Sequence, residues 1–166
     1  MLELLNCEIK PLGCEFISRI FDPTLPARIS VLTLDYNNFG NSGLFNLMTY
    51  LTTNKTLTYL SLSYCGIDEN GIKYFDQFLK NTTTLKKFIL QGNPLKNTGL
   101  KELIGLLYDN VTIEEINLNN ILFGNDVETV KSLVSLMGSA DNILTYHVKF
   151  NFLTFEGNNF ISFNLI

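Results

Sequence analysis

The chain repeats one pattern of apolar and small residues every 28 positions through its centre. The stretch from Leu57 and the stretch from Leu85 align residue by residue, and a third matching unit begins at Ile29. The aligned positions of the middle unit are Leu57, Leu60, Leu62, Cys65, Ile67, Gly71, Phe75, Phe78 and Leu79. A period of roughly 20–50 residues indicates a solenoid of stacked units, because one unit alone cannot bury its apolar face.

The same pattern extends, less completely, to both ends of the chain. The first unit holds two extra residues in the loop "DPTLPAR", and the fifth places Ile121 where Asn or Cys is expected and Val127 where Gly is expected. We expect a single domain over residues 1–166 with about six repeats. Their approximate boundaries are 1–28, 29–56, 57–84, 85–112, 113–142 and 143–166.

Each unit combines a short strand with a helix. The leucines of its first part alternate, so they point to one side of a strand. The part after the glycine repeats apolar residues at helical spacing, as in Leu100, Leu103, Ile104 and Leu107. The residues expected to cap the helix starts are Asn41, Asp68, Asn97 and Asp126. The predicted fold is therefore α/β, with a parallel sheet on one side of a continuous core and helices on the other.

The unit reads LxxLxLxxN/CxL followed by a helix. This pattern resembles the leucine-rich repeats of the ribonuclease-inhibitor type, and the resemblance covers essentially the whole chain. It implies a curved horseshoe with parallel β-strands on the concave face and helices on the convex face. Relatives of this repeat class include ribonuclease inhibitor, the activator of the Ran GTPase, actin-regulatory scaffolds, innate-immune sensor domains and ciliary subunits. Nearly all of them bind other proteins.

One position after each strand is occupied by Asn or Cys in most units. We expect these side chains to be buried and to hydrogen-bond backbone groups of the turn, with Cys acting as a small buried residue. A structural role is therefore favoured over a ladder of ligands or a reactive thiol. The residues at this position are Cys7, Asn37, Cys65, Asn93 and Asn151.

Between the buried leucines, alternate strand residues are expected to face outward on the concave side and to bind a protein. Tyr36 and Tyr64 are one repeat apart, so they should be neighbours, with Tyr59 close by. Exposed tyrosines in a group are common anchors of protein interfaces. The alternative is a scatter of ordinary surface residues. The predicted binding residues are Asp35, Tyr36, Tyr59, Ser61, Tyr64, Lys87, Gln91, Glu115, Asn117 and Asn119.

The sequence predicts no catalytic residues, no cofactor and no metal ion. His147 is the only histidine and has no nearby Cys, Asp or Glu pair to complete a metal site. No nucleophile with an accompanying base is visible, and "QGNPLKNTG" lacks the spacing of a phosphate-binding loop. Three Asn-x-Thr triplets, at Asn54, Asn81 and Asn110, fall where a polar residue ends each helix.

Composition and charge limit the classes of partner and the cellular compartments that fit this chain. The net charge is −4 and no basic stripe is present, which argues against nucleic acid. No apolar run reaches the roughly 18 residues of a membrane span, so no membrane insertion is expected. The N-terminus "MLELLNCEIK" has no secretory signal, and three cysteines without paired spacing favour a reducing compartment. We expect a cytoplasmic protein, with a cytoskeletal or ciliary location as an option.

Both ends of the chain lack the polar cap that closes a solenoid. The first strand motif is missing its first leucine, and the last stretch, "NFLTFEGNNFISFNLI", is strongly apolar. We expect either a fragment of a longer solenoid or ends covered by further repeats or partner subunits. The predicted function is a non-enzymatic protein–protein interaction module or a scaffold subunit of a larger assembly. The alternatives are a small-GTPase regulator resembling the Ran GTPase-activating protein and a ciliary or cytoskeletal scaffold component.

Overall fold

The computed structural model of the protein describes residues 1–26 and 28–152. Short strands alternate with helical segments along this part of the chain. The strands are β1 (Leu2–Glu3), β2 (Val31–Thr33), β3 (Tyr59–Ser61), β4 (Lys87–Ile89), β5 (Glu115–Asn117) and β6 (Thr145–His147). The helical segments are α1 (Pro11–Ser18), the 3-10 turn η1 (Arg19–Phe21), α2 (Gly40–Leu51), the 3-10 segment η2 (Glu69–Phe75), α3 (Asp76–Asn81), α4 (Lys96–Leu107) and α5 (Val127–Ser139).

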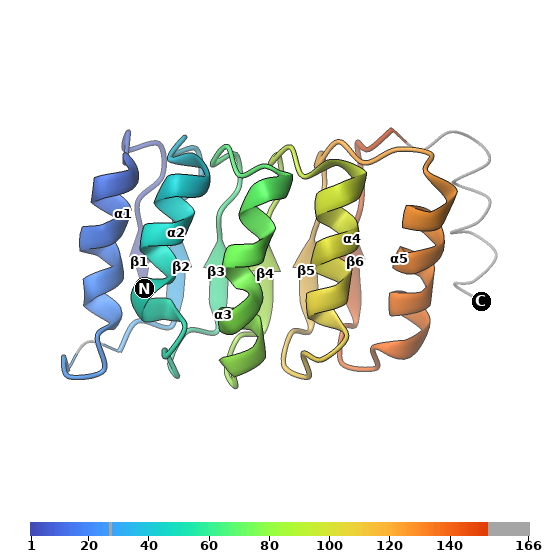
Figure 1. Ribbon diagram of the computed structural model, residues 1–166. Helices are drawn as coiled ribbons and strands as arrows, with labels where there is room; N and C mark the ends of the chain where they lie inside the picture. Colours follow the sequence, from blue (N-terminus) through green and yellow to red (C-terminus); the bar gives the residue numbers. More distant parts are fainter. Residues whose placement is uncertain (27, 153–166) are drawn as a thin grey trace.

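The strands form one parallel, 6-stranded sheet in the order β1-β2-β3-β4-β5-β6. Corresponding residues of successive units pair in register, as Leu32, Leu60, Phe88 and Ile116 do. Figure 1 shows two layers, with the helices along one side of the sheet and the units following one another in chain order. The predicted α/β fold with a parallel sheet and a layer of helices is therefore confirmed.

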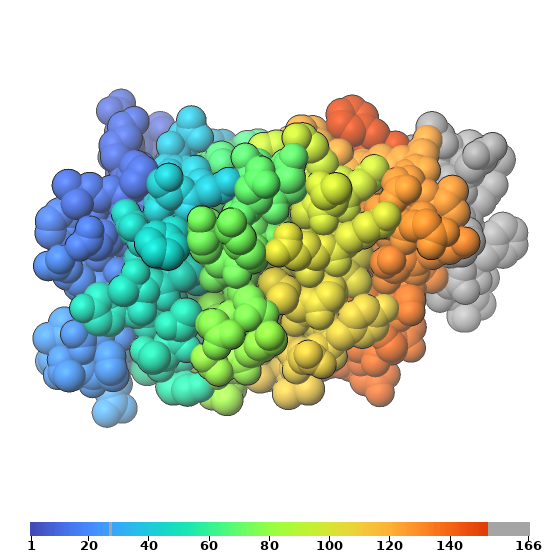
Figure 2. All heavy atoms as spheres, in the orientation of Figure 1, coloured from blue at the N-terminus to red at the C-terminus, as the bar shows by residue number. Residues whose placement is uncertain are grey.

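One apolar core runs between the two layers. Leu60 and Leu62 on the strand side and Phe75 on the helix side are 0% exposed. Phe75 and Phe88 meet edge to face, with their ring centroids 5.1 Å apart. Seen from the helix side, the helical segments of neighbouring units lie against one another (Figure 2). Each unit thus buries its apolar side against its neighbours, as a solenoid requires.

Two of the four predicted capping residues do cap helical segments. The Asp68 side chain accepts a hydrogen bond from the Asn70 amide at 2.8 Å, at the start of η2. The Asp126 side chain accepts one from the Thr129 amide at 3.0 Å, at the start of α5. These carboxylates satisfy amide groups that a helix start leaves without partners.

The prediction that Asn41 and Asn97 cap helices is wrong. Helices α2 and α4 begin one residue earlier, so both asparagines lie inside the first turn. Their side chains reach the next unit instead. Asn41 Nδ2 donates to Asp68 Oδ1 at 2.7 Å, and the Gly124 amide donates to Asn97 Oδ1 at 2.8 Å. These contacts join neighbouring units near the helix starts.

The helical part of the third unit is divided into two pieces. The sequence predicts helical spacing after Gly71, whereas the structure has the 3-10 segment η2 followed by the short helix α3. Phe75 and Phe78 are nevertheless buried, so the apolar pattern holds across the change of helix type. The helical part expected in the sixth unit, 143–166, would follow β6, and residues 153–166 of that unit lie outside the described residues.

Candidate protein-binding face

The face of the sheet opposite the helices, here called the strand face, includes the predicted binding residues. Strand residues alternate between the core and this face. Tyr36 and Tyr64 come shortly after β2 and β3, at the carboxyl ends of these strands. The strand face consists of Glu3, Asp35, Tyr36, Tyr59, Ser61, Ser63, Tyr64, Lys87, Gln91, Glu115, Asn117, Asn119, His147 and Lys149.

The rings of Tyr36 and Tyr64 stack, with centroids 4.7 Å apart and planes 8° from parallel. Both residues have a left-handed backbone, with φ of 59° and 54°, and the same position of the next unit is Gly92, with φ of 73°. A Cβ atom at Gly92 would lie 2.3 Å from the Tyr64 ring, so the glycine gives that ring room to lie over the next unit. Tyr36 is 53% exposed, which leaves much of its ring open to a partner.

The prediction that Ser61 presents its side chain to a partner is wrong. Ser61 is 1% exposed, and Ser63, two residues further along, is 6% exposed. Asp35 of the preceding unit binds both residues. Its Oδ1 atom accepts hydrogen bonds from Ser61 Oγ at 2.6 Å and from the Ser63 amide at 2.8 Å. The serines therefore hold the carboxylate in place, and Asp35 is the group that a partner can reach.

A row of polar side chains continues across the next units. Gln91 Nε2 donates to the Tyr64 hydroxyl at 3.4 Å, and Asn117 Nδ2 donates to Gln91 Oε1 at 3.2 Å. The Asn119 amide donates to Asn117 Oδ1 at 3.0 Å, and the Lys149 amide donates to Asn119 Oδ1 at 2.6 Å. Most of these bonds join side chains or backbone of neighbouring units, so the predicted binding residues Gln91, Asn117 and Asn119 are held in defined positions.

An ion pair occupies the middle of the strand face. Lys87 Nζ lies 2.6 Å from one carboxylate oxygen of Glu115, and His147 Nε2 lies 3.4 Å from the other. The hydrogen bond from Lys87, followed by its positive charge, holds the pKa of Glu115 below the ordinary value. The same contact raises the pKa of Lys87. Both groups therefore stay charged at neutral pH and largely neutralise each other.

Tyr59 does not join the tyrosine stack. It begins β3, where it pairs in register with Val31 and Lys87 and is half-buried. Tyr64 lies in the turn beyond the other end of that strand. The stack thus consists of Tyr36 and Tyr64, and the closeness of Tyr59 to them stays a prediction.

The asparagine that follows each strand is bound to backbone groups of the turn. Asn93 is 0% exposed, and its Oδ1 atom accepts hydrogen bonds from the Cys65 and Ile67 amides at 3.1 and 3.0 Å. Its Nδ2 atom donates to the Leu62 and Leu90 carbonyls at 2.7 and 2.9 Å. One side chain thus links two neighbouring turns, which is a structural role.

Asn37 and Asn151 repeat this arrangement. The Oδ1 atom of Asn37 accepts hydrogen bonds from the Cys7 and Ile9 amides at 2.8 and 3.1 Å. The Oδ1 atom of Asn151 accepts one from the Ile121 amide at 2.9 Å. Each asparagine therefore receives its donors from the preceding unit, and the row acts as a seam along the solenoid.

The two cysteines at this row position differ. Cys65 is 0% exposed, its Sγ donates to the Leu34 carbonyl of the preceding unit at 3.3 Å, and burial raises the pKa of its thiol to about 12. A thiol that stays protonated in this way is a poor nucleophile. The expectation that Cys7 is buried is wrong: it is exposed, and its Sγ donates only to Leu5 of its own unit, at 3.3 Å.

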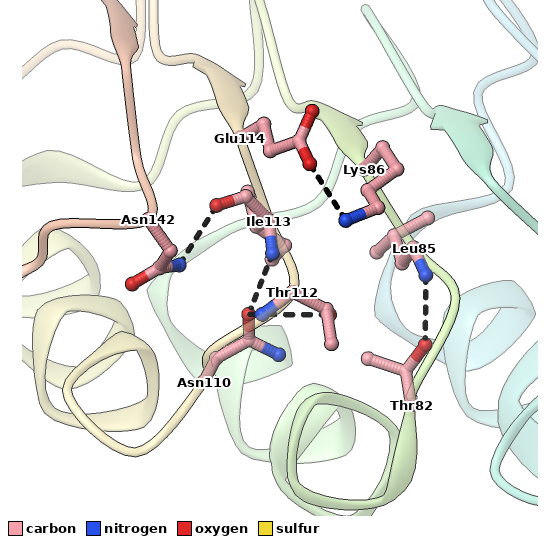
Figure 3. A network of polar contacts seen from close by, with 8 residues as sticks. All are labelled: Thr82, Leu85, Lys86, Asn110, Thr112, Ile113, Glu114 and Asn142. Carbon is pink, nitrogen blue, oxygen red and sulfur yellow. Dashed lines mark hydrogen bonds and ion pairs between the residues drawn. The ribbon is translucent and has the colours of Figure 1, made fainter.

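A second polar row lies where each helix returns to the next strand (Figure 3). Asn110 is 3% exposed, and its Oδ1 atom accepts hydrogen bonds from the Thr112 and Ile113 amides at 3.0 and 2.9 Å. Its Nδ2 atom donates to the Leu79 carbonyl, and Asn142 Nδ2 donates to the Ile113 carbonyl. The Asn-x-Thr triplet at Asn110 therefore closes a turn, a role that its recurrence at repeat spacing could have indicated.

The described part of the chain carries neither a metal-binding cluster nor a membrane-spanning helix. Over residues 1–26 and 28–152, no group of three or more His, Cys, Asp or Glu side chains is placed to hold a metal ion. In the same part of the chain, no helix combines the length and the apolar character needed to cross a membrane.

Both a family model and curated proteins match the sequence. A family model described as "Leucine Rich repeat" matches residues 53–75 of the chain. The mouse (Mus musculus) protein "NACHT, LRR and PYD domains-containing protein 14" is 26% identical over 125 residues. That alignment covers 74% of this chain and 12% of the mouse protein, so the chain spans a small part of its relative's length.

Two solved structures share the arrangement of strands and helices. The leiomodin-1 actin-binding site 2 superimposes with a TM-score of 0.65 and 17% identity, covering 92% of this chain and 87% of the other. The tropomodulin C-terminal domain of Caenorhabditis elegans superimposes with a TM-score of 0.68 and 15% identity, covering 93% of this chain and 90% of the other. At such identities the similarity is evidence of a common fold alone.

Proposed function

We propose that the chain is a leucine-rich repeat protein and a non-enzymatic protein–protein interaction module that binds a partner protein through the strand face. The observation that carries this proposal is the Tyr36–Tyr64 stack, in which Tyr36 is 53% exposed. The proposal includes a repeat of the ribonuclease-inhibitor type, horseshoe curvature with the strand face on the concave side, and a single domain over 1–166. It also includes a role as a scaffold or complex subunit in the cytoplasm.

The order of the strand face supports this function. Binding costs about 0.5–1.5 kcal/mol for each flexible side chain that must be immobilised at an interface. Gln91 and Asn117 are already joined by a hydrogen bond, and Lys87 is already paired with Glu115. A partner that binds this face therefore contacts side chains that are already held in position. Stacked aromatic rings add a large, rigid contact area.

The proposal is tested by placing a photo-crosslinking amino acid on each side of the molecule. Lys87 and Lys149 mark the strand face, and the exposed residues Gln77 and Glu102 mark the helices as matched controls. In extracts of cells that express the protein, we expect a defined adduct from the two strand-face positions that excess unmodified protein competes away. Competable adducts from the helix positions alone would contradict the proposal.

A cytoskeletal or ciliary scaffold is the second candidate. The observation that favours it is the fold shared with the actin-binding site 2 of leiomodin-1. Co-sedimentation of the purified chain with actin filaments tests this candidate. A chain that stays in the supernatant at filament concentrations of about 100 µM, where even weak specific contacts are populated, argues against it.

The small-GTPase regulator stays a prediction from the repeat pattern. It requires that the protein accelerate GTP hydrolysis by a small GTPase. A single-turnover hydrolysis assay, with and without the purified chain, decides it, and unchanged rates would remove this alternative.

A further inference from the structure

The strand face contains one carboxylate that is only half satisfied inside the protein. Asp35 Oδ1 is bound by Ser61 and Ser63. Its other oxygen, Oδ2, makes no hydrogen bond or ion pair with any residue that the structure describes. The residue is half-buried and is followed directly by the exposed Tyr36. A carboxylate held by two serines therefore directly precedes, in the sequence, an exposed aromatic residue whose ring is stacked on Tyr64.

Some charged side chains of the strand face form ion pairs and others do not. Lys87 and Glu115 neutralise each other in the middle of the face. Asp35 beside β2 and Glu3 in β1 take part in no ion pair within residues 1–26 and 28–152. Two carboxylates without an ion-pair partner therefore lie at the β1–β2 end of the face, and charge complementarity favours a cationic group of a partner beside Asp35.

Arginine has the chemistry that fits this pair of features. Its guanidinium group is flat, stacks on aromatic rings, and donates two parallel hydrogen bonds to carboxylates. The ammonium group of lysine can pair with Asp35 but cannot stack as a plane on Tyr36. We propose that Tyr36 and Asp35 form a recognition site for an arginine side chain on a basic segment of the partner protein. This inference rests on the proposed function, since it names the chemistry of the partner at the same face.

The test titrates the isotope-labelled 166-residue chain, with labelled tyrosine rings, with three capped tripeptides observed by NMR. The probes are Ac-Gly-Arg-Gly-NH2, its lysine counterpart and its citrulline counterpart, which has the shape of arginine without the charge. We expect the arginine peptide to shift the Tyr36 ring signals and the Asp35 amide signal saturably. It should bind about threefold tighter than the lysine peptide and about tenfold tighter than the citrulline peptide. Equal binding of arginine and citrulline peptides, or no shift at Tyr36, overturns the proposal.

Two matched carboxylate variants isolate the charge of Asp35. Asp35→Asn keeps an oxygen that can accept from Ser61 and Ser63, so it removes the charge with little change of structure. We expect this variant to bind the arginine peptide about tenfold more weakly. Glu115→Gln removes a carboxylate that Lys87 already neutralises, and it should change the affinity by less than about twofold. Equal losses in the two variants would indicate general attraction between charges and overturn the proposed site.

Two ring variants isolate the contribution of Tyr36. Tyr36→Phe keeps a ring and should retain the affinity within about twofold, whereas Tyr36→Leu should weaken it about threefold.

Failure of this inference and failure of the proposed function give different results. Crosslinking from Lys87 and Lys149 does not depend on arginine, so retained adducts without arginine selectivity remove this inference alone. Loss of the adducts removes the proposed function.

Discussion

Replacing Asn93 with alanine tests whether the buried asparagine row holds neighbouring units together. The side chain binds the Cys65 and Ile67 amides and the Leu62 and Leu90 carbonyls, at a position that is 0% exposed. A buried donor left without a partner costs about 1–3 kcal/mol, and a carbonyl tolerates the loss more easily. Asn93→Ala leaves two buried amides without partners. If each costs about 1.5 kcal/mol, the free energy of unfolding falls by about 3 kcal/mol.

Urea denaturation followed by circular dichroism measures this loss, and amide hydrogen exchange reports on Cys65 and Ile67 directly. The matched control is Asn151→Ala, because Asn151 makes the same kind of hydrogen bonds at a half-exposed position. Water can replace the lost partners there, so we expect a cost of about 1 kcal/mol. If both substitutions cost the same, or if Asn93→Ala costs less than about 1 kcal/mol, the burial argument is refuted.

Three further predictions concern the core, a turn and a charged cap. Leu60→Ala opens a cavity at a position that is 0% exposed and should lower the free energy of unfolding by about 2–5 kcal/mol in urea denaturation. Gly92→Ala adds a Cβ atom at a φ of 73° and against the Tyr64 ring, so it should cost about 1–2 kcal/mol and move the ring signals of Tyr64 in NMR spectra. The hydrogen bond from Lys101 lowers the pKa of Asp126 from 3.8 to about 2. That carboxylate therefore stabilises the fold above pH 3.8, the contribution is lost as the pH falls towards 2, and Asp126→Asn should flatten the measured stability in this window.

The 28-residue period was sufficient to predict the strands and the buried leucines. One side of each strand packs against the helices, so the same positions must be apolar in every unit. Leu32, Leu60 and Phe88 pair in register and are 0% exposed, as the alignment predicts. The Asn positions could be predicted for the same reason. A turn that recurs in every unit leaves the same backbone groups to be bound each time.

Contacts between side chains of neighbouring units could not be predicted in this way. The alternation of strand residues places Ser61 on the strand face, but it does not say that Asp35 of the preceding unit binds the hydroxyl and leaves the serine 1% exposed. Helix start signals likewise placed Asn41 near a cap, whereas the helix begins one residue earlier and the side chain binds Asp68. In each case the outcome depends on a side chain of another unit, which the repeat pattern does not specify.

The same dependence governs the candidate site. The Tyr36 ring rests on Tyr64, and the Tyr64 ring lies where Gly92 of the following unit has no side chain. The position of the exposed ring is therefore set by a residue two units away along the chain. Recognition of Tyr36 by a partner therefore also depends on Gly92. Gly92→Ala should lower the affinity for the arginine peptide even though Gly92 lies outside the proposed contact. An unchanged affinity would mean that Tyr36 keeps its position without support from Tyr64.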